Sequence, residues 1–320
     1  MSLAPIVLFV YNRPEHTRRT LSALKRNNLA SESVLHIFAD GIKTDASDEQ
    51  RERVEAVCTV IHSEQWCGEV IIHEAAENKG LYQSVRQGVT EIIEQYGKVI
   101  VMEDDLQTSP AFLSYMNKAL DFYAERKSVF SVSGYNYPAT RMSFPTDYGY
   151  DTFVCLRNSS WGWATWQDRW AQIDWDVDAY QTIKTTPAMR AALNRMGDDE
   201  FDLLLQRMEY GLNIWSIQFT IAHFVNHAVA IYPVHSYVHN MGNDGSGENC
   251  SATHSLDNVI LSTNMTPKFI DILYEDSRII NAFYNVNCRT HRPLWQRVIN
   301  VIARKFGRKA PFIIKKKIYE

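Results

Sequence analysis

The sequence predicts an α/β fold built on a largely parallel β-sheet. Short apolar runs alternate with amphipathic stretches of helical length through residues 1–135, and strands that alternate with helices in this way form βαβ units. Polar or acidic residues follow four of the apolar runs. The chain has 320 residues, of which 45% are hydrophobic and 22% charged, as is ordinary for a globular protein of one large domain or two modest ones.

Five apolar runs in the first half of the chain are predicted strands. They are residues 5–11, 34–39, 69–73, 98–102 and 129–133. Helices are predicted between them, at residues 15–28, 45–62, 80–96 and 110–126. Pro14 is a favoured first-turn residue at the start of the first helix. Val54, Val57 and Ile61 recur at helical spacing in the second helix.

The second half of the chain is predicted to mix strands and helices. Residues 148–157 are expected to form one or two strands, residues 174–224 to be mostly helical, and residues 228–232 to form a late strand. The tryptophan-rich run at residues 161–166 is expected to open a helix that continues to Trp170. Because tryptophan is costly to expose, most of these rings should lie in a packed core.

Gly162 separates two tryptophans, Trp161 and Trp163, and leaves a backbone gap beside two flat apolar faces. Sugar rings stack on such faces, so these two residues are candidates for binding an acceptor. The alternative is that both rings belong to a packed core corner.

Four groups of polar residues follow predicted strands and should meet at one edge of the sheet, where ligands of parallel sheets bind. They are Asn12-Arg13, Asp40-Gly41, Asn78-Lys79-Gly80 and Glu103-Asp104-Asp105. The three consecutive acids predict a platform for Mg²⁺ or Mn²⁺, which prefer oxygen ligands and keep positions open for substrate phosphates. The alternative is a solvated acidic loop.

The residues beside this platform suit a nucleoside diphosphate. Arg13 and Lys79 carry the charge that a diphosphate needs. The carboxylate of Asp40 can accept a hydrogen bond from an N–H of a base or from a ribose hydroxyl. Alternatively, Asp40 only forms a turn with Gly41. Arg13, in turn, would alternatively form only an ion pair on the surface. Residues 239–250 contain three glycines, which predicts either a loop that closes over phosphates or an ordinary surface loop.

The charge of the chain is unevenly distributed. Residues 289–320 contain ten Lys or Arg and one acid, so the remainder is acidic and the net charge is -4. The basic segment includes apolar residues and Trp295, which predicts docking on an anionic membrane surface; the alternative is a C-terminal helix packed on the body. The acidic body disfavours a nucleic-acid partner.

Two further features bear on where the protein works. The chain has no apolar stretch of the ~20 residues that a spanning helix needs. Its five scattered cysteines show no metal-type spacing, which favours reduced thiols in the cytoplasm over a disulfide framework.

Together these motifs resemble the nucleotide-sugar glycosyltransferases of the GT-A fold, in particular the N-acetylglucosaminyltransferase I-like branch and bacterial surface-polysaccharide sugar transferases. The best match is residues 98–115, where a strand, Glu-Asp-Asp-Leu and Ser-Pro-Ala-Phe-Leu-Ser-Tyr follow in the family's order. The resemblance covers residues 4–135 well. The tryptophan pair and the glycine loop match the bacterial relatives more than the eukaryotic enzymes.

The resemblance implies a Rossmann-like mixed sheet flanked by helices, with a helical C-terminal extension. Residues 1–135 would form the donor-binding half, residues 136–288 the acceptor and catalytic half of the same domain, and residues 289–320 a basic amphipathic tail. The implied reaction is metal-dependent transfer of a sugar from a nucleoside diphosphate, a UDP-sugar being expected, to a saccharide or lipid-linked saccharide in surface polysaccharide synthesis. The enzyme would be cytoplasmic and peripheral on the inner membrane.

The resemblance also implies roles for individual residues. Asp105 would be the direct Mn²⁺ or Mg²⁺ ligand, with Glu103 and Asp104 organising the ribose and metal-bound waters. The other implied nucleotide contacts are Tyr11, Arg13, Asp40 and Lys79, of which Asp40 recognises the base. A second metal ligand would be His239 or His254.

The chain departs from the family pattern at the catalytic base. The segment that carries an Asp in inverting relatives corresponds to residues 215–219, which contain no carboxylate. Asp199, Glu200 or Glu209 then supplies the base, or the transfer is retaining, or the enzyme is degenerate. Asp199 and Glu200 are the preferred catalytic candidates, and their alternative is an exposed helix start.

Two other functions remain open at this point. A sugar-nucleotide nucleotidyltransferase would need a basic glycine-rich loop after the first strand, and residues 10–14 contain no glycine. A non-catalytic nucleotide-sugar or carbohydrate-binding protein would keep the sheet and lack the base.

Overall fold

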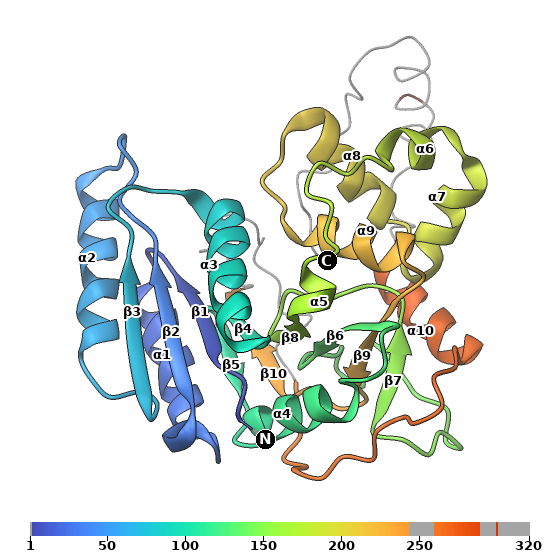
Figure 1. Cartoon of the computed structure of the whole chain (residues 1–320), viewed down its shortest axis with the longest axis horizontal. Helices are drawn as coiled ribbons and strands as arrows, with labels where there is room; N and C mark the ends of the chain where they lie inside the picture. Colours follow the sequence, from blue (N-terminus) through green and yellow to red (C-terminus); the bar gives the residue numbers. More distant parts are fainter. Residues whose placement is uncertain (1, 243–258, 289–298, 300–320) are drawn as a thin grey trace.

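The computed structural model describes residues 2–242, 259–288 and 299. Its main sheet has eight strands in the order β3-β2-β1-β4-β8-β6-β9-β7 (Figure 1). Helices cover the sheet, so the predicted α/β fold with a mixed sheet flanked by helices is confirmed. Residues from before and after position 135 contribute strands to this one sheet.

The first four strands are parallel and define the edge at which the polar residues gather. They are β1 (Ile6–Val10), β2 (Val34–Ala39), β3 (Glu69–Glu74) and β4 (Lys98–Glu103). β1 lies between β2 and β4, with Val10 opposite Ala39 and Phe9 opposite Glu103. The residues that follow these strands therefore leave the sheet at its carboxyl edge, side by side.

Helices cover both faces of this parallel half. Helices α1 (Pro14–Lys25) and α2 (Asp48–His62) bury Leu21, Val57 and Ile61 against Leu35 and Ile37 of β2. On the opposite face, helix α3 (Gly80–Tyr96) packs against β1 and β4. Figure 1 shows α2 and α3 on either side of these strands. The boundaries agree with the sequence because each helix carries an apolar stripe and the strands β1, β2 and β4 are mostly buried. β3, at the edge of the sheet, is half-buried with exposed ends.

The second half makes the sheet mixed. β6 (Val129–Ser133) and β9 (Val229–Pro233) are parallel, β7 (Thr152–Cys155) pairs antiparallel with β9, and β8 (Trp163–Trp166) lies antiparallel between β4 and β6.

The prediction that residues 161–166 open a helix is wrong for β8, and only α5 (Gln167–Trp170) is helical. All four residues of β8 are buried, because both faces of the sheet are covered at this point. An apolar run that is buried on both faces has no alternation to distinguish a strand from a helix.

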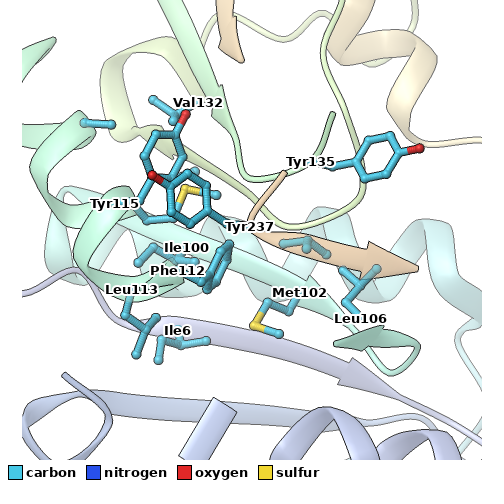
Figure 2. Packing of buried hydrophobic residues seen from close by; sticks show 14 of the residues in the cluster. Ile6, Ile100, Met102, Leu106, Phe112, Leu113, Tyr115, Val132, Tyr135 and Tyr237 are labelled. Carbon is cyan, nitrogen blue, oxygen red and sulfur yellow. The ribbon is translucent and has the colours of Figure 1, made fainter. Parts of the chain in front are cut away.

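A second, two-stranded sheet joins the acidic turn to a distant part of the chain. β5 (Leu106–Thr108) pairs antiparallel with β10 (Val238–Asn240), and His239 lies opposite Gln107. Just before β10, the ring of Tyr237 stacks on Tyr115 of helix α4 (Phe112–Phe122), with ring centres 4.3 Å apart. Figure 2 shows this pair above Phe112, Ile100 and Met102. These three-residue strands were not predicted, since strands so short carry no periodicity.

The remaining helices lie mainly between β8 and β9 and at the end of the described chain. They are α6 (Tyr180–Thr185), α7 (Pro187–Leu193), α8 (Glu200–Tyr210), α9 (Ser216–Val225), α10 (Ser277–Asn287) and the short 3₁₀ turns Ala30–Glu32 and Asn194–Met196. The prediction of a mostly helical segment at residues 174–224 is therefore confirmed. Within the described residues, no helix is both long and apolar enough to cross a bilayer.

Candidate functional site

The acidic turn, residues 103–105, lies where β4 ends and β5 begins. Asp104 and Asp105 are only 5% and 4% exposed. Two backbone tethers hold the turn: Thr20 Oγ1 of α1 donates to the Asp104 carbonyl at 2.8 Å, and the Met241 N–H donates to the Asp105 carbonyl at 2.8 Å. The turn is therefore a buried, fixed feature, and the prediction of a solvated loop does not apply to Asp104 and Asp105.

Arg13 reaches both aspartates from the end of β1. Its Nη2 atom donates to Asp104 Oδ1 and, at 2.9 Å, to Asp105 Oδ2. Arg13 immediately precedes α1, where Thr17 donates to its carbonyl from both N–H and Oγ1 at 2.9 Å. The alternative of a surface ion pair is wrong, because all three side chains are mostly buried.

The charges of this cluster do not balance. Burial raises the pKa of Asp104, an effect that Asp105 reinforces and that Arg13 and, more weakly, His16 oppose. Burial disfavours the charged Arg13, but the two carboxylates outweigh that effect and raise its pKa above the ordinary value. Two buried carboxylates thus share one guanidinium. An uncompensated buried carboxylate is costly, which makes the cluster a site for a further positive charge.

Asp105 Oδ1 is the atom best placed to meet that charge. It is buried, and no hydrogen-bond donor among the described residues reaches it. The described part of the chain contains no group of three His, Cys, Asp or Glu arranged to hold a metal. Mg²⁺ and related cations nevertheless bind through one or two carboxylates when substrate phosphates and water complete the shell. A carboxylate oxygen in this setting fits such an ion.

The chain that follows β10 closes against the acidic turn at Gly242. A Cβ atom built on Gly242 would overlap Asp105 Oδ2 and lie 3.1 Å from Arg13 Nη1. The Gly242 N–H donates to Oδ1 of the buried Asn240 at 2.7 Å, which fixes this approach. His239 is half-buried on β10 opposite Gln107 of β5. His254 and residues 243–250 of the predicted glycine loop lie outside the described residues.

Asp40 anchors the turn that begins α3. Its Oδ1 accepts from the N–H groups of Gly41 and Lys79 at 2.9 and 2.7 Å, and its Oδ2 accepts from the Gly80 N–H at 2.8 Å and Asn78 Nδ2 at 3.0 Å. Gly80 has φ +74°, a left-handed conformation that favours glycine. These four bonds use the acceptor positions of the carboxylate. Asp40 therefore joins the β2 and β3 ends, and any contact with a base would come through the turn that it shapes.

A cavity of about 210 Å³ lies beside this turn, between the β2 and β3 ends and α3. The Phe38 ring stacks on His73 in its wall, with ring centres 4.2 Å apart. Polar groups of α3 form the opposite wall. Its lining residues are Phe38, Ala39, Asp40, His73, Glu74, Ala75, Lys79, Ser84, Gln87, Gly88 and Glu91. Tyr11, at the end of β1, is half-buried with Lys43 Nζ 5.7 Å from its ring centre.

The two candidate acceptor tryptophans differ in position. Trp163 is 1% exposed and packs with Trp215 and Trp170 at ring-centre distances of 5.2 and 5.6 Å. Its expected acceptor role is wrong, because the ring is enclosed in the core. Trp161 is half-buried and meets the Tyr135 ring edge-on, with centres 4.5 Å apart.

The expected general bases are engaged in ion pairs. Asp199 and Glu200 are 6% and 2% exposed, so an exposed helix start is also wrong. Arg157 Nη1 and Nη2 contact the two Asp199 oxygens at 2.9 and 3.2 Å, and Arg157 Nε contacts Glu200 Oε1 at 2.5 Å. Glu209 pairs with Lys184 at 2.5 Å and accepts from Tyr180 at 2.7 Å.

A carboxylate that neutralises a buried arginine is poorly placed to accept a proton, so these ion pairs argue against Asp199 and Glu200 as catalytic bases. Sequence reasoning missed Arg157 as their partner. An arginine two residues after a buried strand was the signal available.

No protein-family model matches the chain, and no curated protein sequence matches it. Among solved structures, the chain is similar to the mannosyltransferase PcManGT from Pyrobaculum calidifontis in complex with GDP-Man and Mn²⁺, at 11% identity over 52% of this chain and 44% of that chain, with a TM-score of 0.36. It is similar to TarS from S. aureus at 12% identity over 74% of this chain and 59% of the other, with a TM-score of 0.38.

Mouse xyloside xylosyltransferase 1 shows 13% identity over 70% of this chain and 82% of its own, with a TM-score of 0.33. The chain spans 44% and 59% of the length of the first two structures. It is thus distantly similar to solved glycosyltransferases, at similarity levels that leave its function to the geometry of its own site.

Proposed function

We propose that this chain is a metal-dependent glycosyltransferase that takes a sugar from a nucleoside diphosphate. The buried acidic turn carries the proposal, because Asp104 and Asp105 share one guanidinium and Asp105 Oδ1 meets no donor among the described residues. A divalent cation held by Asp105 beside a bound diphosphate would balance the charge. Bound there, it would act as a Lewis acid that stabilises the charge developing on the leaving diphosphate.

The residues of the site divide the work on the donor. Asp105 would ligate Mn²⁺ or Mg²⁺ directly, Asp104 would orient metal-bound water, and Glu103 would hold the ribose. The turn anchored by Asp40, with Lys79 in it, borders the cavity beside β2 and β3. This turn and Tyr11 would receive the base. The expected donor half, residues 1–135, supplies all of these groups.

The finer assignments extend the same proposal. The GT-A arrangement, a UDP-sugar donor and a saccharide or lipid-linked saccharide acceptor in surface polysaccharide synthesis are consistent with the strand-end cluster. Trp161 is the remaining acceptor candidate, since its ring is half-buried. His239 is kept as a second metal ligand because β10 runs beside the acidic turn. The basic tail, residues 289–320, would dock the enzyme on the anionic inner face of a membrane; apart from Ile299 it lies outside the described residues.

Nucleotide titration tests the donor site. We expect isothermal titration with UDP and with GDP to show binding that requires Mn²⁺ in the wild type and falls by at least about tenfold, or about 1.4 kcal/mol, in Asp105→Asn. Asp147→Asn is the matched control, because Asp147 pairs with an arginine on the surface. Equal affinity of the wild type and Asp105→Asn for both nucleotides would overturn the proposal.

A non-catalytic nucleotide-sugar-binding protein is a second candidate. One observation favours it: Asp199, Glu200 and Glu209 are each ion-paired. Incubation with a panel of nucleotide sugars and Mn²⁺ separates the two, because slow hydrolysis of any donor requires a catalytic site. Turnover that disappears in Asp105→Asn would exclude the binding protein.

A further inference from the structure

Arg13 faces the acidic turn in the position that a cation would take. A single atom, Nη2, contacts both Asp104 Oδ1 and Asp105 Oδ2. Two carboxylate oxygens that converge on one point create the strongest negative potential there, and one positive charge at that point compensates both. The Asp104 and Asp105 side chains are 7% and 6% exposed, so water does little to reduce this potential.

We propose that Arg13 is an internal counter-cation of the acidic turn, which a divalent metal must displace from Asp105 in order to bind. The inference rests on the proposed metal-dependent function. It adds a regulatory role for this chain's own arginine: Arg13 holds the site together without metal and lowers its affinity for metal alone.

The second arginine cluster shows what a permanent ion pair looks like in the same protein. Arg157 uses three nitrogens on three carboxylate oxygens of Asp199 and Glu200. Such a fork is a specific and rigid arrangement. Arg13 instead makes both ion pairs through one nitrogen, as a point charge would. Its contact with Asp105 is therefore the more easily exchanged for another cation.

The second carboxylate oxygen of Asp105, which is buried, gives the metal a starting point. Oδ1 meets no donor among the described residues, while Oδ2 is held by Arg13. A cation that binds Oδ1 lies close to the guanidinium of Arg13, and two positive charges at that distance repel. The metal and the guanidinium therefore compete for the acidic turn. Thermodynamic linkage requires that removing either one strengthens the binding of the other.

A diphosphate changes this competition. An anion beside the metal offers the displaced guanidinium a new partner, in the bidentate manner that arginine uses with phosphate groups. Arg13 would then support metal binding, which it opposes when the anion is absent. The site thus favours the metal and the diphosphate together over the metal alone.

Titration of the nucleotide-free protein with Mn²⁺ tests whether the metal and Arg13 compete. We expect Arg13→Gln to bind Mn²⁺ at least about tenfold more tightly than the wild type, within the range of ordinary coupling between sites. Its melting temperature should fall in EDTA and rise more steeply with Mn²⁺ than that of the wild type. Arg278→Gln is the matched control, since Arg278 also pairs with two carboxylates, Asp147 and Asp276, but on the surface.

A second titration adds inorganic pyrophosphate. Pyrophosphate should raise the Mn²⁺ affinity of the wild type by a larger factor than that of Arg13→Gln. Equal factors would overturn the exchange of Arg13 from carboxylate to phosphate.

The outcomes separate this inference from the proposed function. If Mn²⁺ binds both proteins but binds Arg13→Gln equally or more weakly, Arg13 is not a competing cation and the proposed metal site stands. If neither protein binds Mn²⁺, the inference and the metal site both fail. Should Arg13→Gln not fold, the arginine side-chain ¹⁵N resonances of the wild type, assigned with Arg13→Lys, decide instead. An Arg13 signal unchanged by saturating Mg²⁺ would overturn the displacement.

Discussion

Gly242 lies against Asp105 so closely that a methyl group on its Cα would overlap the Asp105 carboxylate oxygen Oδ2. The two residues are brought together by the pairing of β10 with β5 and by the hydrogen bond from Met241 to the Asp105 carbonyl. Gly242, which follows Asp105 by 137 residues in the chain, thus packs directly against the acidic turn.

The variant Gly242→Ala should bind Mn²⁺ with UDP at least about tenfold more weakly than the wild type, a loss of about 1.4 kcal/mol. The added Cβ pushes the Asp105 carboxylate and Arg13 away from their positions. Isothermal titration measures the affinity. Gly149→Ala serves as the control, because a Cβ there meets only the tip of Lys268 at 3.9 Å; equal affinities in all three proteins would contradict the prediction.

The variant Asp40→Ala should lower the free energy of unfolding by about 1–3 kcal/mol. It removes the acceptor for the N–H groups of Lys79 and Gly80 at the start of α3, and unpaired donors carry a penalty of that size. Urea unfolding followed by circular dichroism measures the change. Asp45→Asn, on an exposed position before α2, should be nearly neutral. A loss no larger for Asp40→Ala than for this control would show that the turn does not depend on the carboxylate.

The variant Arg157→Met should lower the free energy of unfolding by about 3–5 kcal/mol, because it leaves Asp199 and Glu200 buried without their cation. Arg278→Met, which removes a surface pair, should cost about 1 kcal/mol or less. Chemical denaturation of the two variants gives the comparison. Similar losses would mean that the Arg157 cluster is solvated in solution.

The stability of the protein should fall as the pH drops from about 6.5 to about 4, in part because of His223. Burial lowers the pKa of His223 to about 4, with the hydrogen bond to the Phe219 carbonyl opposing the shift. Between the ordinary pKa of 6.5 and that value, the unfolded chain binds a proton that the folded chain does not. Stability is therefore lost as the pH falls, at up to about 1.4 kcal/mol per pH unit.

Replacing His223 with Gln should make the free energy of unfolding depend less steeply on pH, because the variant lacks the proton that the unfolded wild type binds at His223. His36, whose pKa is also lowered to about 4 by burial and by His73, keeps its own contribution in both proteins. Urea unfolding at several pH values between 4 and 7 measures both slopes. Parallel curves for the wild type and His223→Gln would contradict the assignment.

Local patterns in the sequence predicted most of the parallel half and the chemistry of its edge. The strands, the helices α1 to α3 and the polar groups after β1, β2 and β4 follow from apolar runs and helical spacing within a few residues. The local patterns gave the wrong element where the chain is buried on both faces of the sheet. β8 shows no alternation of apolar and polar residues, so residues 163–166 were expected to be helical.

The roles of single carboxylates were harder to predict than their positions. The sequence predicted Asp199 and Glu200 to be catalytic bases or an exposed helix start. Nothing near them in the sequence shows that Arg157 contacts them. The sequence made Trp163 a candidate for binding the saccharide acceptor because its neighbour is glycine. In the structure its ring packs on Trp215 and Trp170. Contacts between residues far apart in the chain, Arg157 with Asp199 and Trp163 with Trp215, decide the two cases.

By itself, the sequence determined that a run of acids ends a buried strand beside an arginine, and this is enough to predict a site for a cation and a diphosphate. Only the tertiary structure decided how the charges are shared. Asp104 and Asp105 face a single nitrogen of Arg13, and Gly242 closes on them from β10. The physical reason is that residue type sets which charges a chain carries, whereas their energy depends on burial and on distances to partners that only the packed chain brings near.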